Sequence, residues 1–162
     1  MLALYPWIVF LHVIGAFAFV LAHGASAIAA FLIRAEREPE RIGLLLDLSR
    51  LGAALSYTGL LVLLLAGIAA GIVGHWFGMG WIWAAIGVLL AIMLGMYATA
   101  TPYYNRVRVA VGKPAYGEGP PTTPVSPTEL AALLETRRPE VIAGIGAVGL
   151  AVLLWLMVFK PF

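Results

Sequence analysis

The stretch LGAALSYTGLLVLLLAGIAAGIVG, residues 51–74, decides the fold, because it contains no charged side chain over 24 consecutive positions. A bilayer core is about 30 Å thick, and about 20 apolar residues in a helix are enough to cross it. Three other stretches have the same character, and they cover residues 2–33, 81–100 and 141–159. The sequence therefore predicts four transmembrane helices, which place both ends of the chain on the same side of the membrane.

The composition of the whole chain agrees with this interpretation. Of its 162 residues, 62% are hydrophobic and 11% are charged, whereas soluble domains average about 45–50% and about 25%. A soluble fold of this length has too little interior to bury so much apolar surface. A cytosolic domain, a disordered tail and a nucleic-acid-binding protein are therefore excluded. The chain has no cysteine, which excludes disulfides, thiolate metal sites, iron–sulfur clusters and thiol catalysis.

We expect an all-α fold, a four-helix transmembrane bundle that forms a single domain over residues 1–162. Residues 113–127 are rich in proline and predict a cytoplasmic linker. Ser126 and Glu129 then have the spacing of a capping box, and they predict a short cytoplasmic helix before the last span. The predicted spans cover residues 3–33, 43–74, 81–109 and 140–159.

The basic residues predict the orientation. Nine of the ten lysines and arginines lie in the first and third loops or directly beside them, and only Lys160 lies at the opposite side. Because cytoplasmic loops are enriched in basic residues, we expect both termini and the short loop around His75 to lie outside. We expect a multi-pass protein of the bacterial inner membrane.

Two histidines lie inside the first predicted span, at positions 12 and 23. An ionisable side chain within the membrane is costly and is by default a candidate for function. Eleven residues along a straight helix amount to three turns and about 20°, with a rise of about 16 Å. His12 and His23 are therefore expected to face the same way at two depths of the bilayer.

Neutral imidazole is a good axial ligand for haem iron. The leading hypothesis is a haem-b-binding membrane protein, or a protein with a related redox cofactor, that transfers electrons. His12 is the first candidate ligand, and His23, His75 and Tyr57 are the candidates for a second ligand. By depth, His12 and His75 are the better bis-histidine pair.

Two alternatives remain open. In the first, the histidines only bond neighbouring helices, and the chain is a non-catalytic subunit or assembly factor. In the second, the protein handles copper at the outer surface, because imidazole and thioether groups are copper ligands. The candidate metal ligands are His12, His23, His75 and Met79, and the last two lie in the same outer loop.

The expected partners follow from this interpretation. They are the lipid bilayer, a membrane redox partner or a larger membrane complex, and a second copy in a homodimer; no nucleic acid is expected. The sequence has no nucleophile motif and no phosphate-binding loop. The spans lack Asp, Glu, Lys and Arg near their centres, which argues against an ion-coupled transporter.

The first span contains FLHVIGA, residues 10–16, and the chain ends in LMVFKP, residues 156–161, after four spans and an arginine-rich first loop. This pattern resembles an uncharacterised family of predicted bacterial integral membrane proteins that is similar to the CopD-like copper-resistance domain. It is also distantly similar to the HemJ-type protoporphyrinogen oxidases, which are small haem-b proteins. The resemblance implies that His12 corresponds to a haem ligand. The HemJ type also uses a lysine in the third span, and residues 81–100 contain none.

Overall fold

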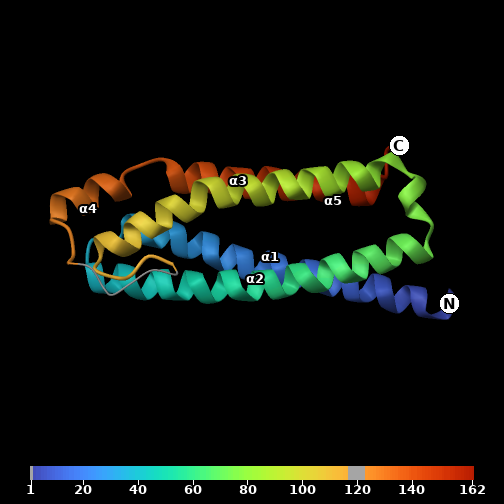
Figure 1. Ribbon diagram of the computed structural model, residues 1–162, viewed down its shortest axis with the longest axis horizontal. Helices are drawn as coiled ribbons and strands as arrows, with labels where there is room; N and C mark the ends of the chain where they lie inside the picture. The colour runs from blue at the N-terminus through green and yellow to red at the C-terminus, as the bar shows by residue number, and fades with distance from the viewer. Residues whose placement is uncertain (1, 117–122) are drawn as a thin grey trace.

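The computed structural model describes residues 2–116 and 123–162. Within these residues the fold is helical and has no strand, and four helices are long and apolar enough to cross a membrane. The predicted all-α architecture is therefore confirmed, and Figure 1 shows the helices lying along one common direction. The elements are η1 (Leu2–Leu4), α1 (Tyr5–Ala35), α2 (Pro39–Val73), η2 (Trp76–Gly78), α3 (Gly80–Ala110), α4 (Pro127–Leu134) and α5 (Arg138–Phe159).

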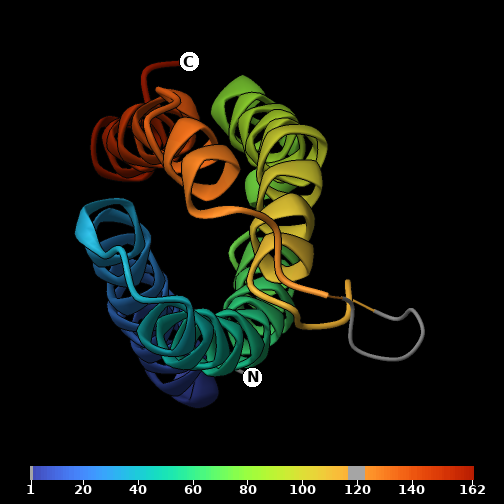
Figure 2. The same cartoon turned by 90° about the vertical axis from the view of Figure 1, so that its left-hand side faces the viewer.

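The four long helices form two antiparallel pairs. The α1–α2 hairpin is one pair, and α3 with α5 is the other, and each pair makes far more contact internally than with its neighbour. In end view the four helices surround a common axis (Figure 2). We call the end that carries residues 36–38 and α4 the basic end, and the end that carries both termini and residues 74–79 the terminal end.

Proline and glycine set the helix boundaries. A proline occupies the first turn of α1, α2, α4 and α5, where its missing N–H costs no hydrogen bond. The helix α2 ends at Val73 and is followed by Gly74 and by His75, whose φ of 57° is left-handed. The helix α4 begins with the two hydrogen bonds of a capping box between Ser126 and Glu129.

The carboxylate of Glu36 stabilises the turn between α1 and α2 through hydrogen bonds to the backbone of that turn. One oxygen of Glu36 accepts hydrogen bonds from the backbone N–H of Arg37 at 2.8 Å and of Glu38 at 3.1 Å. These bonds favour the ionised form and lower the pKa of the Glu36 carboxyl below its usual value. The turn that follows the first predicted span is therefore a polar structure outside the bilayer core.

Glycines bring α1 and α2 into backbone contact. A methyl group placed on Gly15 would lie 2.6 Å from the backbone nitrogen of Leu63, and one placed on Gly59 would lie 2.6 Å from that of Phe19. Within a membrane, helices associate through such close packing because lipid tails are as apolar as leucine. The residues Gly15, Phe19, Ala22 and Ser26 follow one another at spacings of four, three and four along this seam.

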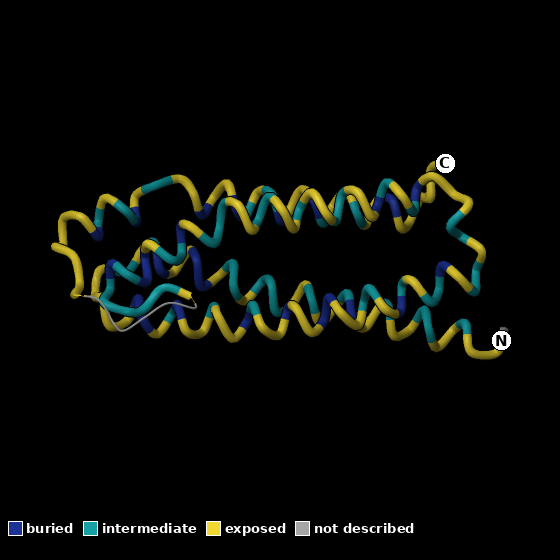
Figure 3. Tube along the Cα trace, viewed as in Figure 1, coloured by how far each residue is buried: buried dark blue, intermediate teal, exposed yellow. Residues whose placement is uncertain are grey.

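Most of the fully buried residues lie at the basic end (Figure 3). There Tyr103, Ile33 and Leu134 come from α3, α1 and α4 and share one apolar cluster. The buried Arg108 guanidinium pairs with Asp47 of α2 at 3.3 Å. These contacts join the two helix pairs beyond the central apolar segments.

The terminal end is closed by aromatic residues. The Trp76 indole donates a hydrogen bond to the Tyr5 hydroxyl at 3.1 Å, and the Lys160 ammonium lies 4.4 Å from the centre of the Trp76 ring. The backbone N–H of Trp81 also donates a hydrogen bond to the carbonyl of Phe162 at 3.0 Å. Between these two ends, α1 touches α5 and α2 touches α3 only sparsely.

Candidate functional site

His12 is directed at α2. Its Nδ1 lies 2.8 Å from the carbonyl oxygen of Leu63. A methyl group placed on Gly67 would lie 2.8 Å from Nδ1 and 2.9 Å from Cε1 of the ring. The Nδ1–Cε1 edge therefore fits against the side of α2 that Gly67 leaves open, and the Nε2–Cδ2 edge is directed away from Gly67.

The hydrogen bond to Leu63 also fixes the tautomer of His12. A carbonyl oxygen can only accept a hydrogen bond, so Nδ1 carries the proton and donates it. In the neutral ring, Nε2 then keeps its lone pair. Histidines that bind metals commonly have this arrangement, with the other ring nitrogen bonded to a backbone carbonyl.

His23 is directed at α5 instead. Its ring stacks on that of Phe19, with the ring centres 5.7 Å apart and the planes at 17°. A methyl group placed on Gly146 would lie 3.0 Å from its Nε2, which is the nearest ring atom. His23 therefore crosses from the first helix pair to the second and fits against α5 at a glycine.

The two histidines do not face a common space, contrary to the expectation from a straight helix. The seam residues of α1 are His12, Gly15, Phe19, Ala22 and Ser26, and their spacings of three, four, three and four residues average 3.5, which is the period of helices that wind around each other. Relative to a seam of this period, two residues eleven positions apart differ in direction around the helix by about 50°. Around a straight helix the difference is about 20°. His12 lies on the seam with α2, whereas His23 follows the seam residue Ala22 and faces α5.

The remaining predicted ligands lie apart from these two. Tyr57 is 67% exposed on α2. His75 and Met79 are both exposed in the turn between α2 and α3. His75 follows Gly67 by eight residues and lies in the turn beyond Val73, the last residue of α2. The Met1 amino group, which could have joined a copper site, lies outside the described residues.

His12 contacts α2, His23 reaches α5 and His75 lies in the turn after α2, so the three histidines lie on different parts of the structure. The Nε2 of His12 has the chemistry that haem iron needs, but the Nε2 of His23 is directed into α5. In the described part of the chain, no group of three His, Asp or Glu side chains is placed to hold a metal ion. The arrangement is one of separate histidines, each packed against another helix.

The sequence did not reveal the partners of these histidines. Leu63 contributes only its carbonyl, which every residue has. Gly67 and Gly146 are two of 18 glycines in the chain, and most apolar segments here contain several. The partners could have been found by matching each histidine with a glycine at the same depth on a neighbouring helix. This match requires knowing which helices are neighbours.

No family model, no curated protein and no solved structure matches the chain.

Proposed function

We propose that this protein is a non-catalytic membrane subunit or assembly factor in which the intramembrane histidines hold helices together. The observation that carries the proposal is the use of both rings in helix packing. His12 bonds the Leu63 carbonyl and fits against Gly67, and His23 reaches Gly146 of the second helix pair. Neither ring needs a cofactor to account for its position.

The arrangement of the helix pairs supports a role in a larger assembly. The pairs are joined at the basic end by Arg108 and Asp47 and at the terminal end by Trp76 and Tyr5. Between these ends they touch sparsely, which leaves helix faces that a helix of another subunit can pack against. We place the protein in the inner membrane of a bacterial cell, with both termini outside, because of the distribution of basic residues.

The test compares the protein from its native membrane with the protein made in a foreign host. We expect the native sample, extracted in a mild detergent, to run in a complex larger than the 17.3 kDa chain and its dimer. The foreign host lacks the partner, so there we expect only the monomer or dimer. An identical small species from both sources contradicts the proposal.

Replacement of His12 tests the structural role directly. We expect His12→Gln to lower the unfolding free energy by about 1 kcal/mol, because the Leu63 carbonyl loses a well-placed donor. The absorption spectrum should stay the same. His75→Asn is the control, since His75 is exposed and asparagine tolerates its left-handed backbone. Thermal unfolding in detergent measures both variants, and equal midpoints for His12→Gln and wild type contradict the role.

Haem b binding for electron transfer is the second candidate, and the tautomer of His12 favours it. With Nδ1 bonded to Leu63, the Nε2 lone pair is available as one axial ligand, and His12 is the residue that would hold the group. A Soret band in protein from haem-replete cells that is lost in His12→Gln would support this function over the first. A colourless protein that fails to take up added hemin would remove it.

A further inference from the structure

Two tyrosines in the apolar segments of α2 and α3 are exposed without a polar partner. Tyr57 is 67% exposed and Tyr97 is 72% exposed. Within the described part of the chain, neither hydroxyl takes part in a hydrogen bond. Lipid tails offer no donor or acceptor, so a hydroxyl that faces them unbonded costs free energy. The chain alone does not supply the partners that these two groups need.

The two tyrosines lie at the same depth. The carboxylate of Asp47 on α2 lies 3.3 Å from the guanidinium of Arg108 on α3, which aligns the two antiparallel helices. Tyr57 follows Asp47 by ten residues, about 15 Å, and Tyr97 precedes Arg108 by eleven residues, about 16 Å. Arg50, directly before the apolar part of α2, is about 10 Å closer to the basic end than Tyr57. Both tyrosines therefore lie inside the hydrocarbon, level with each other.

The tyrosines also lie on the faces by which α2 and α3 meet. Leu46 of α2 is buried in the same apolar cluster as Val107 of α3, and Tyr57 follows Leu46 by eleven residues. Arg108 forms the ion pair with α2, and Tyr97 precedes it by eleven. Eleven residues amount to three turns and about 20–50°, which stays within one helix face about 100° wide. Each tyrosine thus continues a face that is buried at the basic end.

The helices α2 and α3 part before they reach the tyrosines. Figure 1 shows α3 running from the basic end alongside α5, and α3 touches α2 only sparsely. Pro102 lies inside α3 between the ion pair and Tyr97, and a proline within a helix bends it. One turn beyond the tyrosines, Leu61 of α2 and Met93 of α3 are exposed as well. We call Tyr57, Leu61, Met93 and Tyr97 the α2–α3 surface.

One unpaired cation borders the α2–α3 surface at the basic end. Arg50 precedes Tyr57 by seven residues, two turns, and so lies on the same side of α2. It is exposed and, among the described residues, has no acidic partner. Two copies of the chain that met through this surface would bring their Arg50 side chains to one depth, and like charges disfavour such a contact. An occupant with a carboxylate at this level is favoured instead.

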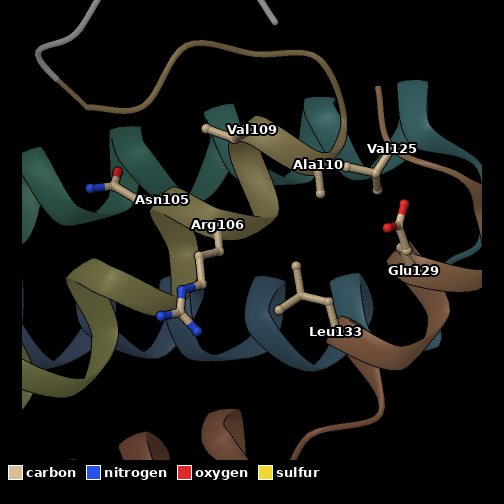
Figure 4. Close-up of a pocket in the computed structure, with 7 residues that line it drawn as sticks. All are labelled: Asn105, Arg106, Val109, Ala110, Val125, Glu129 and Leu133. Atoms are coloured by element: carbon tan, nitrogen blue, oxygen red, sulfur yellow. The ribbon is translucent and has the colours of Figure 1, made fainter. Parts of the chain in front are cut away.

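Arg106 is a comparable cation on another side of α3. It precedes Arg108 by two residues, a rotation of about 200°. Figure 4 shows Arg106 near Leu133 of α4, in a pocket that both residues line. Arg106 is also exposed and, in the described ranges, has no acidic partner. It therefore serves as a matched control for Arg50.

We propose that the α2–α3 surface binds one transmembrane helix of another subunit, which carries a hydrogen-bond acceptor for the tyrosine hydroxyls and a carboxylate for Arg50. The inference rests on the proposed function as a subunit of a larger complex, and it adds the place of contact and the chemistry of the partner helix. Tyrosine, methionine and arginine, which are exposed here, are enriched at protein interfaces. A polar side chain of a helix can accept from a hydroxyl within the membrane, whereas a lipid tail cannot.

Photo-cross-linking in the native membrane tests where the partner lies. Benzoylphenylalanine replaces Leu61 or Met93 in the test proteins, and it replaces Leu21 of α1 or Val148 of α5 in the controls. All four side chains are exposed. We expect positions 61 and 93 to cross-link the same second protein, through a peptide from one of its transmembrane segments. The two control positions should not cross-link that protein.

Conservative variants test the chemistry of the contact. Tyr57→Phe and Tyr97→Phe remove only a hydroxyl that has no partner in the described chain, so the isolated protein should keep its thermal midpoint. Each variant should raise the ratio of free to assembled chain about threefold, the average effect of one interhelical hydrogen bond in a membrane protein. Arg50→Gln should also raise this ratio, whereas Arg106→Gln should leave it as in wild type.

The outcomes separate this inference from the proposed function. A native extract without any complex larger than the dimer removes both. A larger complex in which positions 61 and 93 cross-link only a second copy of the chain, or no protein, overturns this inference alone. So does a complex that dissociates as in wild type after Tyr57→Phe and Tyr97→Phe, or that responds equally to Arg50→Gln and Arg106→Gln.

Discussion

At the scale of single residues, the glycines of the α1–α2 seam determine how closely the two helices pack. Gly15 and Gly59 face backbone atoms of the other helix, whereas Gly24, on the same helix as Gly15, would place a methyl group in open space. Backbone atoms cannot move aside as a flexible side chain can. The two kinds of glycine should therefore respond oppositely to the same substitution.

We expect Gly15→Ala to lower the unfolding free energy by about 1–3 kcal/mol, because the added methyl group forces the helices apart. Gly24→Ala should be neutral or raise it by up to about 1 kcal/mol, since alanine favours a helix more than glycine does. Thermal unfolding in detergent measures both. A Gly15→Ala protein as stable as Gly24→Ala would show that the seam is looser than described.

The residue scale also shows where the sequence was informative. An imidazole inside a span is visible without any structure, and so is its depth in the bilayer. The direction of the ring is not visible, because it depends on the local winding of α1 against α2. The pairing of His12 with His75 stays a prediction for the same reason, since the position of His12 along α2 is set by packing.

At the scale of elements, the charged contacts of Asp47 join α2 to the end of α3. The carboxylate of Asp47 pairs with Arg108 and with Lys113, and the Lys113 ammonium also bonds the carbonyl of Gly43 at 2.9 Å. Arg108 further donates to the carbonyl of Pro114 at 2.9 Å and lies 4.7 Å from the centre of the Tyr116 ring. One acidic residue thus neutralises a buried cation between two helices.

Replacement of that carboxylate should weaken the connection between α2 and α3. We expect Asp47→Asn to cost about 1–2 kcal/mol, because the buried Arg108 loses its counter-charge while the half-exposed site limits the loss. Glu135→Gln is the matched control, as Glu135 is an exposed acid at the same end. Chemical denaturation in mixed micelles measures the transition midpoints of both variants. Equal midpoints for Asp47→Asn and Glu135→Gln would show that Asp47 does not connect α2 to α3.

The elements themselves were largely predictable. The signals that predict them are four long apolar stretches, prolines in the first turns and a capping box at Ser126. Each depends only on residues close in the sequence, so it can be recognised without knowing the fold. The grouping of the helices into two pairs was not predictable. It depends on which glycines meet which backbone, and every span offers several small residues.

At the scale of the whole molecule, the contact between His23 and Gly146 joins the middle segments of the two helix pairs. The pairs are also joined at the basic and terminal ends. A larger residue at position 146 should push α5 away from α1 without disturbing those ends. The chain lacks cysteine, so labels can be introduced at chosen positions.

We expect Gly146→Leu to lengthen the mean distance between spin labels at positions 21 and 148, which are exposed on α1 and α5. The cost in stability should be about 1–3 kcal/mol, as for other overpacked sites. Gly144→Leu is the control on the same helix, because a side chain there meets nothing within 4 Å. Unchanged distances in Gly146→Leu would show that His23 moves aside and does not bridge the pairs.

The separation of the molecule into two helix pairs bears on how it is made. The first pair is complete once Val73 has been synthesised, and its glycine seam needs nothing from the later chain. Domains emerge from the ribosome amino-terminal first, and inserted helices can associate after each has entered the lipid. The helices α1 and α2 can therefore associate during translation. The pair of α3 and α5 then packs against a hairpin that has already formed.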